Sequence, residues 1–410
     1  MTRASRFHLS LLLAAVVSAI GCHGRRAPDW PRPTALTAPP VQERIDQAIA
    51  RGQAFLVADQ NTNGSWGSAT RTKGLNIMAS IPGSHHAFRT GTTALCISAL
   101  IETRPQDPQV IAALVRAEAW LIDFLPRLRR GSLRTVYNTW GHIYGLEALV
   151  RMHERHRDNP DLRSRIAERI RQQIHRLGQN EFLGGGWGYY DFRSGTAHPA
   201  RMATSFTTAA GLVALREAAD AGFEIPPKLL ERALGQLRRQ RSPNFTYLYS
   251  EGHRLYPVSR INRHAGSLGR SCAGNAAGRL WEDEAITDEA LEMCLDRLFA
   301  RGGWLDVGRK KPVPHESFFA IAGYFYYFGH YYGARCIELV PPERQPFYQD
   351  HLADVLLPLQ EADGSWWDYP LYDYHQPYGT AFALRCLQRT RKPGQAQVAS
   401  GREAVGRPIQ

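Results

Sequence analysis

Histidines recur along this chain at regular intervals, each in or just after a long loop that is rich in glycine and aromatic residues. Imidazole exchanges protons near neutral pH and ligates divalent metals, and neighbouring carboxylates can take part in either task. Two loop pairs suit acid–base work best, Asp373 with His375 and His315 with Glu316. The recurring histidines are His86, His142, His198, His264, His315 and His375.

These residue types leave two chemistries open. The histidines and carboxylates would either bind a divalent metal that activates water or act as metal-free acid and base, with tyrosines stacking on a sugar or steadying a cation. The sequence by itself names no cofactor. The catalytic candidates are His375, Asp373, His315, Glu316, His142 and Asp306. The ligand-binding candidates are His86, Trp140, Tyr190, His198, Arg270, Trp367 and Tyr374.

Pairs of helices must position these loops. Six times a charged amphipathic segment is followed by a loop and then by a small-residue segment that is apolar nearly all round. Segments of the first kind are typical of surface helices, and those of the second kind of helices buried on several sides. The charged segments begin near residues 44, 108, 166, 227, 287 and 349, and the apolar ones near 91, 140, 204, 269, 316 and 378.

The repeat predicts the fold class. Alternating outer and inner helices with a period of about 50 residues are typical of helical repeat architectures. Six pairs without a polar capping pair at either end should close into a ring. We therefore predict an all-α protein, an (α/α)6 toroid with its long loops on one face. Loops longer than about 12–15 residues in a compact domain are usually functional, so we place the site at that face.

Four of the long loops open on glycine closely followed by tryptophan, at Trp66, Trp187, Trp304 and Trp366. The glycine can end the outer helix in a left-handed conformation, and the tryptophan can then fold back on the helix pair. Two of these segments also carry a glutamine, in QNTNGSW at 60–66 and QEADGSW at 360–366.

These two segments resemble the QW repeats of squalene and terpene cyclases, and the Gly-Gly-Trp segments resemble degenerate copies. The chain is therefore similar to the terpenoid cyclase and protein prenyltransferase superfamily, and the likeness spans residues 42–388. It implies an α/α toroid whose central cavity binds or transforms a hydrophobic or amphipathic ligand.

The chain departs from the superfamily in its catalytic signatures. The DxDD motif that protonates substrate in class II terpene cyclases does not occur in this sequence, nor does the Asp-x-Cys pair that binds zinc in prenyltransferases. Neither activity carries over residue by residue, so whether the protein is an enzyme stays open. A cyclase-like, transferase-like or lyase-like activity would have to use other residues. The alternatives are a polysaccharide lyase or hydrolase and a non-catalytic envelope binding module.

The N-terminus predicts export. Arg3 and Arg6 precede a short apolar run that ends in Ala-Ile-Gly before Cys22. This end resembles a bacterial lipobox, which implies cleavage before Cys22 and lipidation of its thiol. We expect a signal peptide (1–21), a proline-rich tether (22–41), the toroid domain (42–388) and a disordered tail (389–410). The protein would be an exported, membrane-anchored bacterial lipoprotein, periplasmic or on the outer face.

Charge and cysteines limit the partners. The net charge of +12 comes mainly from arginines, which fits a solvated outer face or attraction to an anionic membrane. No basic run is interleaved with aromatics as in a nucleic-acid module, so we expect no nucleic-acid partner. The expected partners are a membrane, through Cys22, and a small hydrophobic or carbohydrate ligand. The other five cysteines are odd in number and form no CxxC pair, which favours buried thiols over a disulfide framework or a zinc site.

Overall fold

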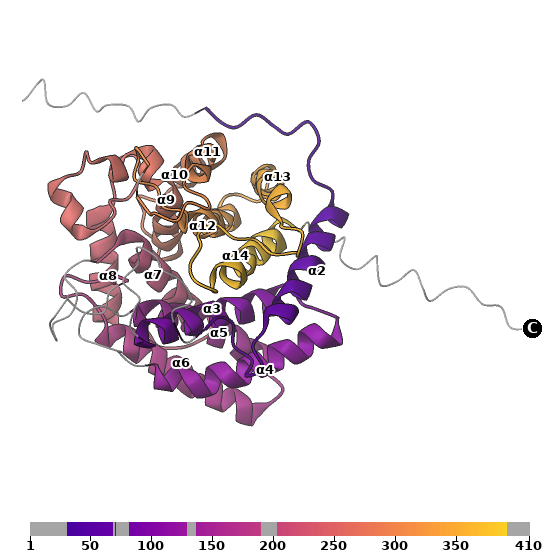
Figure 1. The fold of residues 1–410 in the computed structure, drawn as a ribbon. Helices are drawn as coiled ribbons and strands as arrows, with labels where there is room; N and C mark the ends of the chain where they lie inside the picture. Colours follow the sequence, from indigo (N-terminus) through magenta and orange to yellow (C-terminus); the bar gives the residue numbers. More distant parts are fainter. Residues whose placement is uncertain are drawn as a thin grey trace, which may run out of the picture.

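The computed structural model describes residues 31–68, 70, 82–128, 137–189, 203–315 and 317–391. Within these residues it is built from α-helices and short 3₁₀ segments, and its only β pairing is two isolated bridges. The helices form six outer–inner pairs around a central axis (Figure 1). The predicted all-α class and the α/α toroid are therefore confirmed.

The outer and inner helices alternate along the chain. The outer helices are α2 (Gln42–Asp59), α4 (Pro108–Phe124), α6 (Pro160–Gln179), α8 (Pro227–Gln240), α10 (Asp288–Ala300) and α13 (Gln345–Leu356). The inner helices are α3 (Pro82–Glu102), α5 (Asn138–Arg155), α7 (Ser205–Asp220), α9 (His264–Leu280), α12 (Phe325–Leu339) and α14 (His375–Thr390). The connections add α11 (Gly303–Asp306) and the 3₁₀ segments η1 (Leu125–Arg127), η2 (Glu251–Leu255), η3 (Arg260–Asn262) and η4 (Leu357–Leu359).

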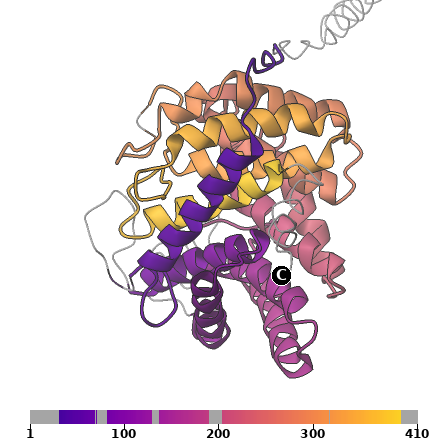
Figure 2. The same cartoon turned by 90° about the vertical axis from the view of Figure 1, so that its right-hand side faces the viewer.

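The ring is closed. Each inner helix packs on the next, and the last, α14, packs on α3, while the first outer helix α2 lies beside α14 (Figure 2). The side-chain amide of Gln360 donates to the backbone carbonyl of Ala48 at 3.0 Å, and Arg51 donates to the carbonyl of Glu361 at 2.9 Å. The sixth pair is thus bonded to the first, as a toroid requires.

Three tryptophans hold helix pairs together. Trp66, Trp187 and Trp366 are each fully buried, and each indole Nε1 donates to a carbonyl near the end of its own outer helix at 2.8–2.9 Å. Their backbone N–H groups donate at 3.0 Å to a threonine of the inner helix that follows. We call these residues the tryptophan staples. The acceptor carbonyls belong to Leu56, Leu177 and Leu356, and the threonines are Thr93, Thr208 and Thr380.

The glycines before the staples contact the next outer helix. Gly64 and Gly364 have φ of +91° and +90°, a conformation that glycine adopts at little cost. A Cβ on either would lie 2.5 Å from a backbone carbonyl, that of Arg116 for Gly64 and that of Arg51 for Gly364. Each loop therefore joins its own helix pair to the following one.

The fifth pair departs from the predicted pattern. The Gly-Gly-Trp segment at 302–304 does not cap α10 but begins the short helix α11, and Trp304 is only half-buried. The fifth inner helix begins at Phe325 rather than near Glu316. Residues 317–324 instead form a connecting segment, in which Ala320 has a positive φ of 55°. This non-helical stretch brings the preceding loop to the axis of the ring.

The C-terminal ends of the inner helices hold a buried network of charges. Arg385 of α14 lies 2.9 Å from Glu147 of α5 and 3.1 Å from Glu102 of α3. Arg151 of α5 joins Glu102 to Glu217 of α7. Although burial raises the pKa of Glu102, the guanidinium groups of Arg385, Arg389 and Arg151 hold it well below its usual range. We call this set the ion network.

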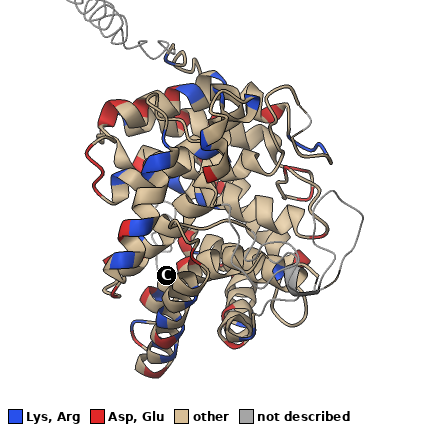
Figure 3. Cartoon of the chain, turned by 90° about the vertical axis from the view of Figure 1, so that its left-hand side faces the viewer, with Lys and Arg blue, Asp and Glu red and all other residues tan. Residues whose placement is uncertain are grey.

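Charges elsewhere lie mainly on the surface. Figure 3 shows basic and acidic positions mixed along the outer helices. In the described part of the chain, no helix combines the length and hydrophobicity that a bilayer-spanning segment needs.

Gly364→Ala should destabilise the protein more than Gly222→Ala. Both glycines have positive φ, +90° and +87°, which costs alanine about 1–2 kcal/mol. Only at Gly364 would the new Cβ meet a backbone atom, the Arg51 carbonyl at 2.5 Å, whereas nothing lies within 4 Å at Gly222. Denaturant unfolding of both variants measures the difference, and equal losses would show that the Gly364 contact contributes nothing.

Candidate functional site

A cavity of about 290 Å³ lies on the axis of the ring, at the N-terminal ends of the inner helices. Aromatic side chains form most of its wall. From the inner helices these are Phe88, Trp140, Tyr144, Phe206, Phe325, Phe328 and Tyr378, and from the connecting loops Tyr137, Tyr189, Tyr324 and Tyr369. His315 is the one imidazole among the described lining residues, and no carboxylate is among them.

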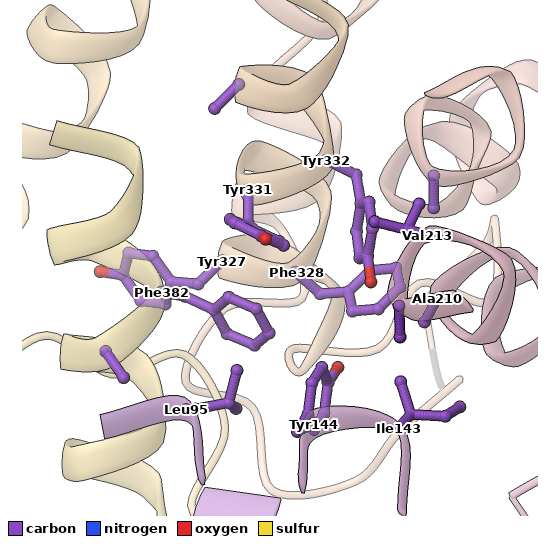
Figure 4. Packing of buried hydrophobic residues seen from close by; sticks show 14 of the residues in the cluster. Leu95, Ile143, Tyr144, Ala210, Val213, Tyr327, Phe328, Tyr331, Tyr332 and Phe382 are labelled. Atoms are coloured by element: carbon purple, nitrogen blue, oxygen red, sulfur yellow. The ribbon is translucent and has the colours of Figure 1, made fainter. Parts of the chain in front are cut away.

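The core beneath the cavity is also aromatic. Figure 4 shows Phe328, Tyr331 and Tyr332 of α12 facing Tyr144 of α5 and Phe382 of α14. The ring centroids of Tyr331 and Phe382 are 5.2 Å apart, and those of Phe328 and Tyr332 are 4.7 Å apart. The guanidinium carbon of Arg385 also lies over the ring of Tyr331, 4.2 Å from the ring centroid. An aromatic layer thus separates the cavity from the ion network.

His315 and Tyr324 form a hydrogen-bonded pair at the cavity wall. The Nδ1 of His315 lies 2.7 Å from the carbonyl of Ala320, an arrangement in which Nδ1 carries the proton and donates. Nε2 is then the acceptor and lies 2.9 Å from the hydroxyl of Tyr324. Burial and the charge of Arg270 lower the pKa of His315. The imidazole is therefore neutral at pH 7, and its acceptor nitrogen orients the Tyr324 hydroxyl at the wall of an apolar space.

Arg270 supports this wall from behind. Its guanidinium is buried and donates to the carbonyls of Tyr247 (2.9 Å), Gly266 (2.7 Å) and Ile261 (2.6 Å). It also lies 5.6 Å from the ring centroid of Tyr249, whose own ring contacts His315 edge-on at 5.5 Å. Burial lowers the pKa of Arg270 to about 9. Arg270 therefore orders the loop before α9, and its ring contact with Tyr249 connects it to the cavity wall.

The residues around the start of α14 form a neighbouring group. The Tyr374 hydroxyl lies 3.1 Å from Nδ1 of His85, and the ring of Tyr374 contacts the cavity residue Phe88 at 5.8 Å. His375 packs edge-on against Trp367 at 5.3 Å, and Asp373 is half-buried beside them. The Nζ of Lys310 lies 4.4 Å from the Trp367 ring centroid. This group adjoins the cavity without lining it.

His142 lies away from the cavity although it sits near Trp140, which lines it. Its Nδ1 lies 2.7 Å from the side-chain oxygen of Gln173 on α6, so the ring bonds α5 to the outer helix of the next pair. Burial lowers its pKa to about 4. Residues two positions apart on a helix point in different directions, and the sequence alone does not say which of Trp140 and His142 faces the axis. The structure gives His142 a packing role.

Two further candidates also lie outside the cavity. Asp306, at the end of α11, is exposed and pairs with Arg309 at 2.5 Å. His86 lies beside Arg89, 3.3 Å from its guanidinium, and its ring packs on Phe124 of α4 at 5.4 Å. Glu316, Tyr190, His198 and Cys22 lie outside the described residues.

No three His, Cys, Asp or Glu side chains within the described ranges lie close enough together to hold a metal ion. His264, one of the recurring histidines, lies near Asn244 at 3.2 Å rather than beside His315. The expected gathering of histidines at one point is therefore not seen among the described residues, where His315 alone reaches the cavity.

Sequence reasoning missed several residues of the site. Tyr324, Phe325 and Phe328 belong to the aromatic run of the fifth repeat, which reads equally well as core or as a cavity wall. Asp368 lies behind this wall, where its carboxylate accepts from the backbone N–H of Tyr327 at 3.0 Å and so caps α12. Burial raises the pKa of Asp368 to about 7. The density of aromatics was the only signal available.

Sequence comparison matches neither a protein-family model nor a curated protein. Among solved structures, the chain is similar to the GH76A α-1,6-mannanase of a Salegentibacter species, with 9% identity, a TM-score of 0.53, and coverage of 84% of this chain and 98% of that one. An unsaturated glucuronyl hydrolase specific for heparin shows 10% identity, a TM-score of 0.52, and coverage of 85% and 97%.

The type II terpene cyclase MstE from Scytonema shows 15% identity, a TM-score of 0.49, and coverage of 85% and 98%. Likeness at these identities shows the fold alone, which the mannanase and the glucuronyl hydrolase share with this chain. The α/α-toroid fold that the QW-like segments implied is thus confirmed.

His142 should make the protein less stable in mild acid. Its pKa is about 4 in the folded protein, against 6.5 for a free histidine. Between these values the unfolded chain binds a proton that the folded one does not, so the free energy of unfolding should fall as pH falls from about 6.5 to about 4 and stay level above. His142→Gln replaces the titrating imidazole with a neutral amide and should reduce this slope by up to about 1.4 kcal/mol per pH unit.

Denaturant unfolding at several pH values measures the slope. The matched control is His175→Gln, at an exposed histidine on α6. If both variants reduced the slope equally, the packing role of His142 would be wrong.

Proposed function

We propose that the protein binds a hydrophobic or amphipathic molecule in its central cavity and holds the polar end of that molecule at His315 and Tyr324. The observation that carries this proposal is the composition of the wall. It is a nearly continuous aromatic surface with one hydrogen-bonded histidine–tyrosine pair. Specific small-molecule sites commonly combine an apolar wall with a few well-placed polar groups.

The wall suits an unsaturated hydrocarbon chain. Burial of apolar surface drives binding at roughly 25 cal/mol per Å². The aromatic faces can also stabilise positive charge that develops on a bound ligand. Five of the six inner helices, α3, α5, α7, α12 and α14, contribute side chains to the cavity lining. The ligand would therefore be enclosed by most of the ring rather than by one helix pair.

The polar pair supports proton transfer as well as binding. Neutral His315 accepts the proton of Tyr324 in a hydrogen bond, and a ligand hydroxyl beside Tyr324 could enter the same chain of bonds. The Tyr324 hydroxyl is a weak acid here, since burial raises its pKa above the usual value. Binding is therefore the function we propose, and acid–base conversion of the ligand is the reaction that this pair supports best.

A carbohydrate ligand is the second candidate. Tyrosine hydroxyls at Tyr137, Tyr189 and Tyr369 and the stacking surface of Trp140 favour it. Most glycoside hydrolases, however, use two carboxylates on either side of the scissile bond. The described lining residues include no carboxylate, so the hydrophobic ligand is the better supported of the two.

We also propose the predicted cellular setting. Export, lipidation at Cys22 and attachment to a bacterial membrane rest on the sequence of residues 1–22. A lipid anchor would keep the cavity near a membrane, where hydrophobic ligands are concentrated. A non-catalytic envelope module would fit the same setting if the bound molecule is released unchanged.

Gly91→Leu should block the cavity. Gly91 lines it, and a Cβ there would find its nearest atoms at 3.6 Å, so alanine fits and only a longer side chain fills the space. We expect the leucine variant to bind the fluorophore N-phenyl-1-naphthylamine, and its competitor farnesol, about tenfold more weakly or worse, and Gly91→Ala to bind as the unaltered protein does.

Fluorescence titration measures both affinities. Gly178→Leu on α6, where nothing lies within 4 Å, is the matched control for the added side chain. Unchanged probe binding in Gly91→Leu would overturn the proposed binding site, and preferential binding of mannotetraose would favour the carbohydrate ligand.

Tyr324→Phe should weaken farnesol binding about tenfold, because the alcohol loses a hydrogen-bond partner in an apolar site. His315→Ala should weaken it similarly, because the Tyr324 hydroxyl loses the acceptor that orients it. Both variants should bind the hydrocarbon farnesene as the unaltered protein does, since farnesene has no hydroxyl. Competition titrations with the two ligands separate these effects. Equal losses for both ligands would mean that the pair shapes the wall and does not hold the polar end.

A further inference from the structure

Two buried thiols meet between α9 and α10, outside the central cavity. The Sγ atoms of Cys272 on α9 and Cys294 on α10 are 3.0 Å apart. Heavy atoms that merely pack lie about 3.5–4.0 Å apart, and a disulfide bond is about 2.05 Å long. The two sulfurs are therefore closer than a packing contact and within about 1 Å of bonding distance.

We infer that Cys272 and Cys294 form a disulfide bond when the chain folds in the presence of an oxidant. A third cysteine lies nearby, since the Cys336 thiol donates to the carbonyl of Cys272 at 3.3 Å and also contacts the Cys272 thiol. Cys294 is the better partner because its sulfur is 3.0 Å from that of Cys272. The odd number of cysteines after Cys22 argues against a framework of several disulfides but is compatible with one disulfide bond. Cys96, Cys336 and Cys386 would remain as buried thiols.

The bond would reinforce a part of the ring that the tryptophan staples do not reach. The staples belong to the first, third and sixth helix pairs. Cys272 lies on the inner helix of the fourth pair and Cys294 on the outer helix of the fifth, and α9 and α10 pack on each other. A covalent link between these residues, which are 22 positions apart, would restrict the unfolded chain and fix this junction.

Oxidation must occur before the core closes. Each bond formed removes two electrons and two protons from the thiols, and an external disulfide such as glutathione disulfide takes them up to become two thiols. Exchange requires a thiolate, but in the folded core the contact with Cys272 and burial raise the pKa of the Cys294 thiol well above its usual range. Neither side chain is accessible, with exposed fractions of 0% and 1%. The reaction therefore belongs to folding, as in a chain exported to an oxidising compartment.

Mass spectrometry tests the bond directly. The reduced full-length chain is refolded with a glutathione and glutathione disulfide mixture, denatured, and alkylated with N-ethylmaleimide without reductant. Trypsin should then release peptides 271–279 and 280–297 as one linked species, while Cys22, Cys96, Cys336 and Cys386 carry the label. Label on both Cys272 and Cys294 would overturn the inference. The same alkylation of protein purified without reductant gives an answer that does not depend on refolding.

Stability provides the second measurement. Protein refolded with the glutathione mixture should have a thermal midpoint about 5 °C above that of protein refolded with reductant throughout, and Cys294→Ala should show no such difference. Cys336→Ala, a buried cysteine of the same cluster, is the matched control and should respond as the unaltered protein does. Two results would contradict the inference. One is a thermal midpoint of the unaltered protein that reductant during refolding does not change, and the other is loss of the effect of reductant in Cys336→Ala rather than in Cys294→Ala.

Discussion

A buried tryptophan and the glycine before it hold three of the six helix pairs in place, and the closure of the ring depends on them. In the sixth pair, the Trp366 indole bonds to the end of α13, its backbone bonds to α14, and Gly364 rests on a carbonyl of α2. One short segment therefore fixes the angle between two helices and the distance to a third. In the three stapled pairs these contacts set where the inner helix begins, and hence where that part of the cavity wall stands.

The ring has two unlike ends. At one end the inner helices start, their side chains are aromatic, and the cavity is found there. At the other end the same helices finish in the ion network of Glu102, Glu147, Arg151, Glu217 and Arg385. Buried ion pairs contribute little net stability, but an unpaired partner is costly, so such a network favours one register of the helices. The charged end thereby helps to hold the aromatic end in shape.

The functional pair depends on an irregular stretch of chain. His315 has a positive φ of 65°, unusual for a side chain of its size, and its Nδ1 is held by the carbonyl of Ala320. Had the fifth inner helix begun near Glu316, as its apolar sequence indicated, His315 would lie at a helix start instead of on a loop that turns into the axis. The non-helical segment before α12 is thus what brings an imidazole to the cavity.

The sequence by itself determined the helix pairs, the toroid and the role of the Gly-Trp segments at Trp66, Trp187 and Trp366, because apolar periodicity and glycine conformation are local properties. It also brought His315 and Trp140 to attention. Only the tertiary structure decided that Trp140 faces the axis while His142 faces α6, that Tyr324 partners His315, and that charges gather at the far end. Those facts depend on the rotation of each helix about its own axis and on residues brought together from distant repeats, neither of which one stretch of sequence records.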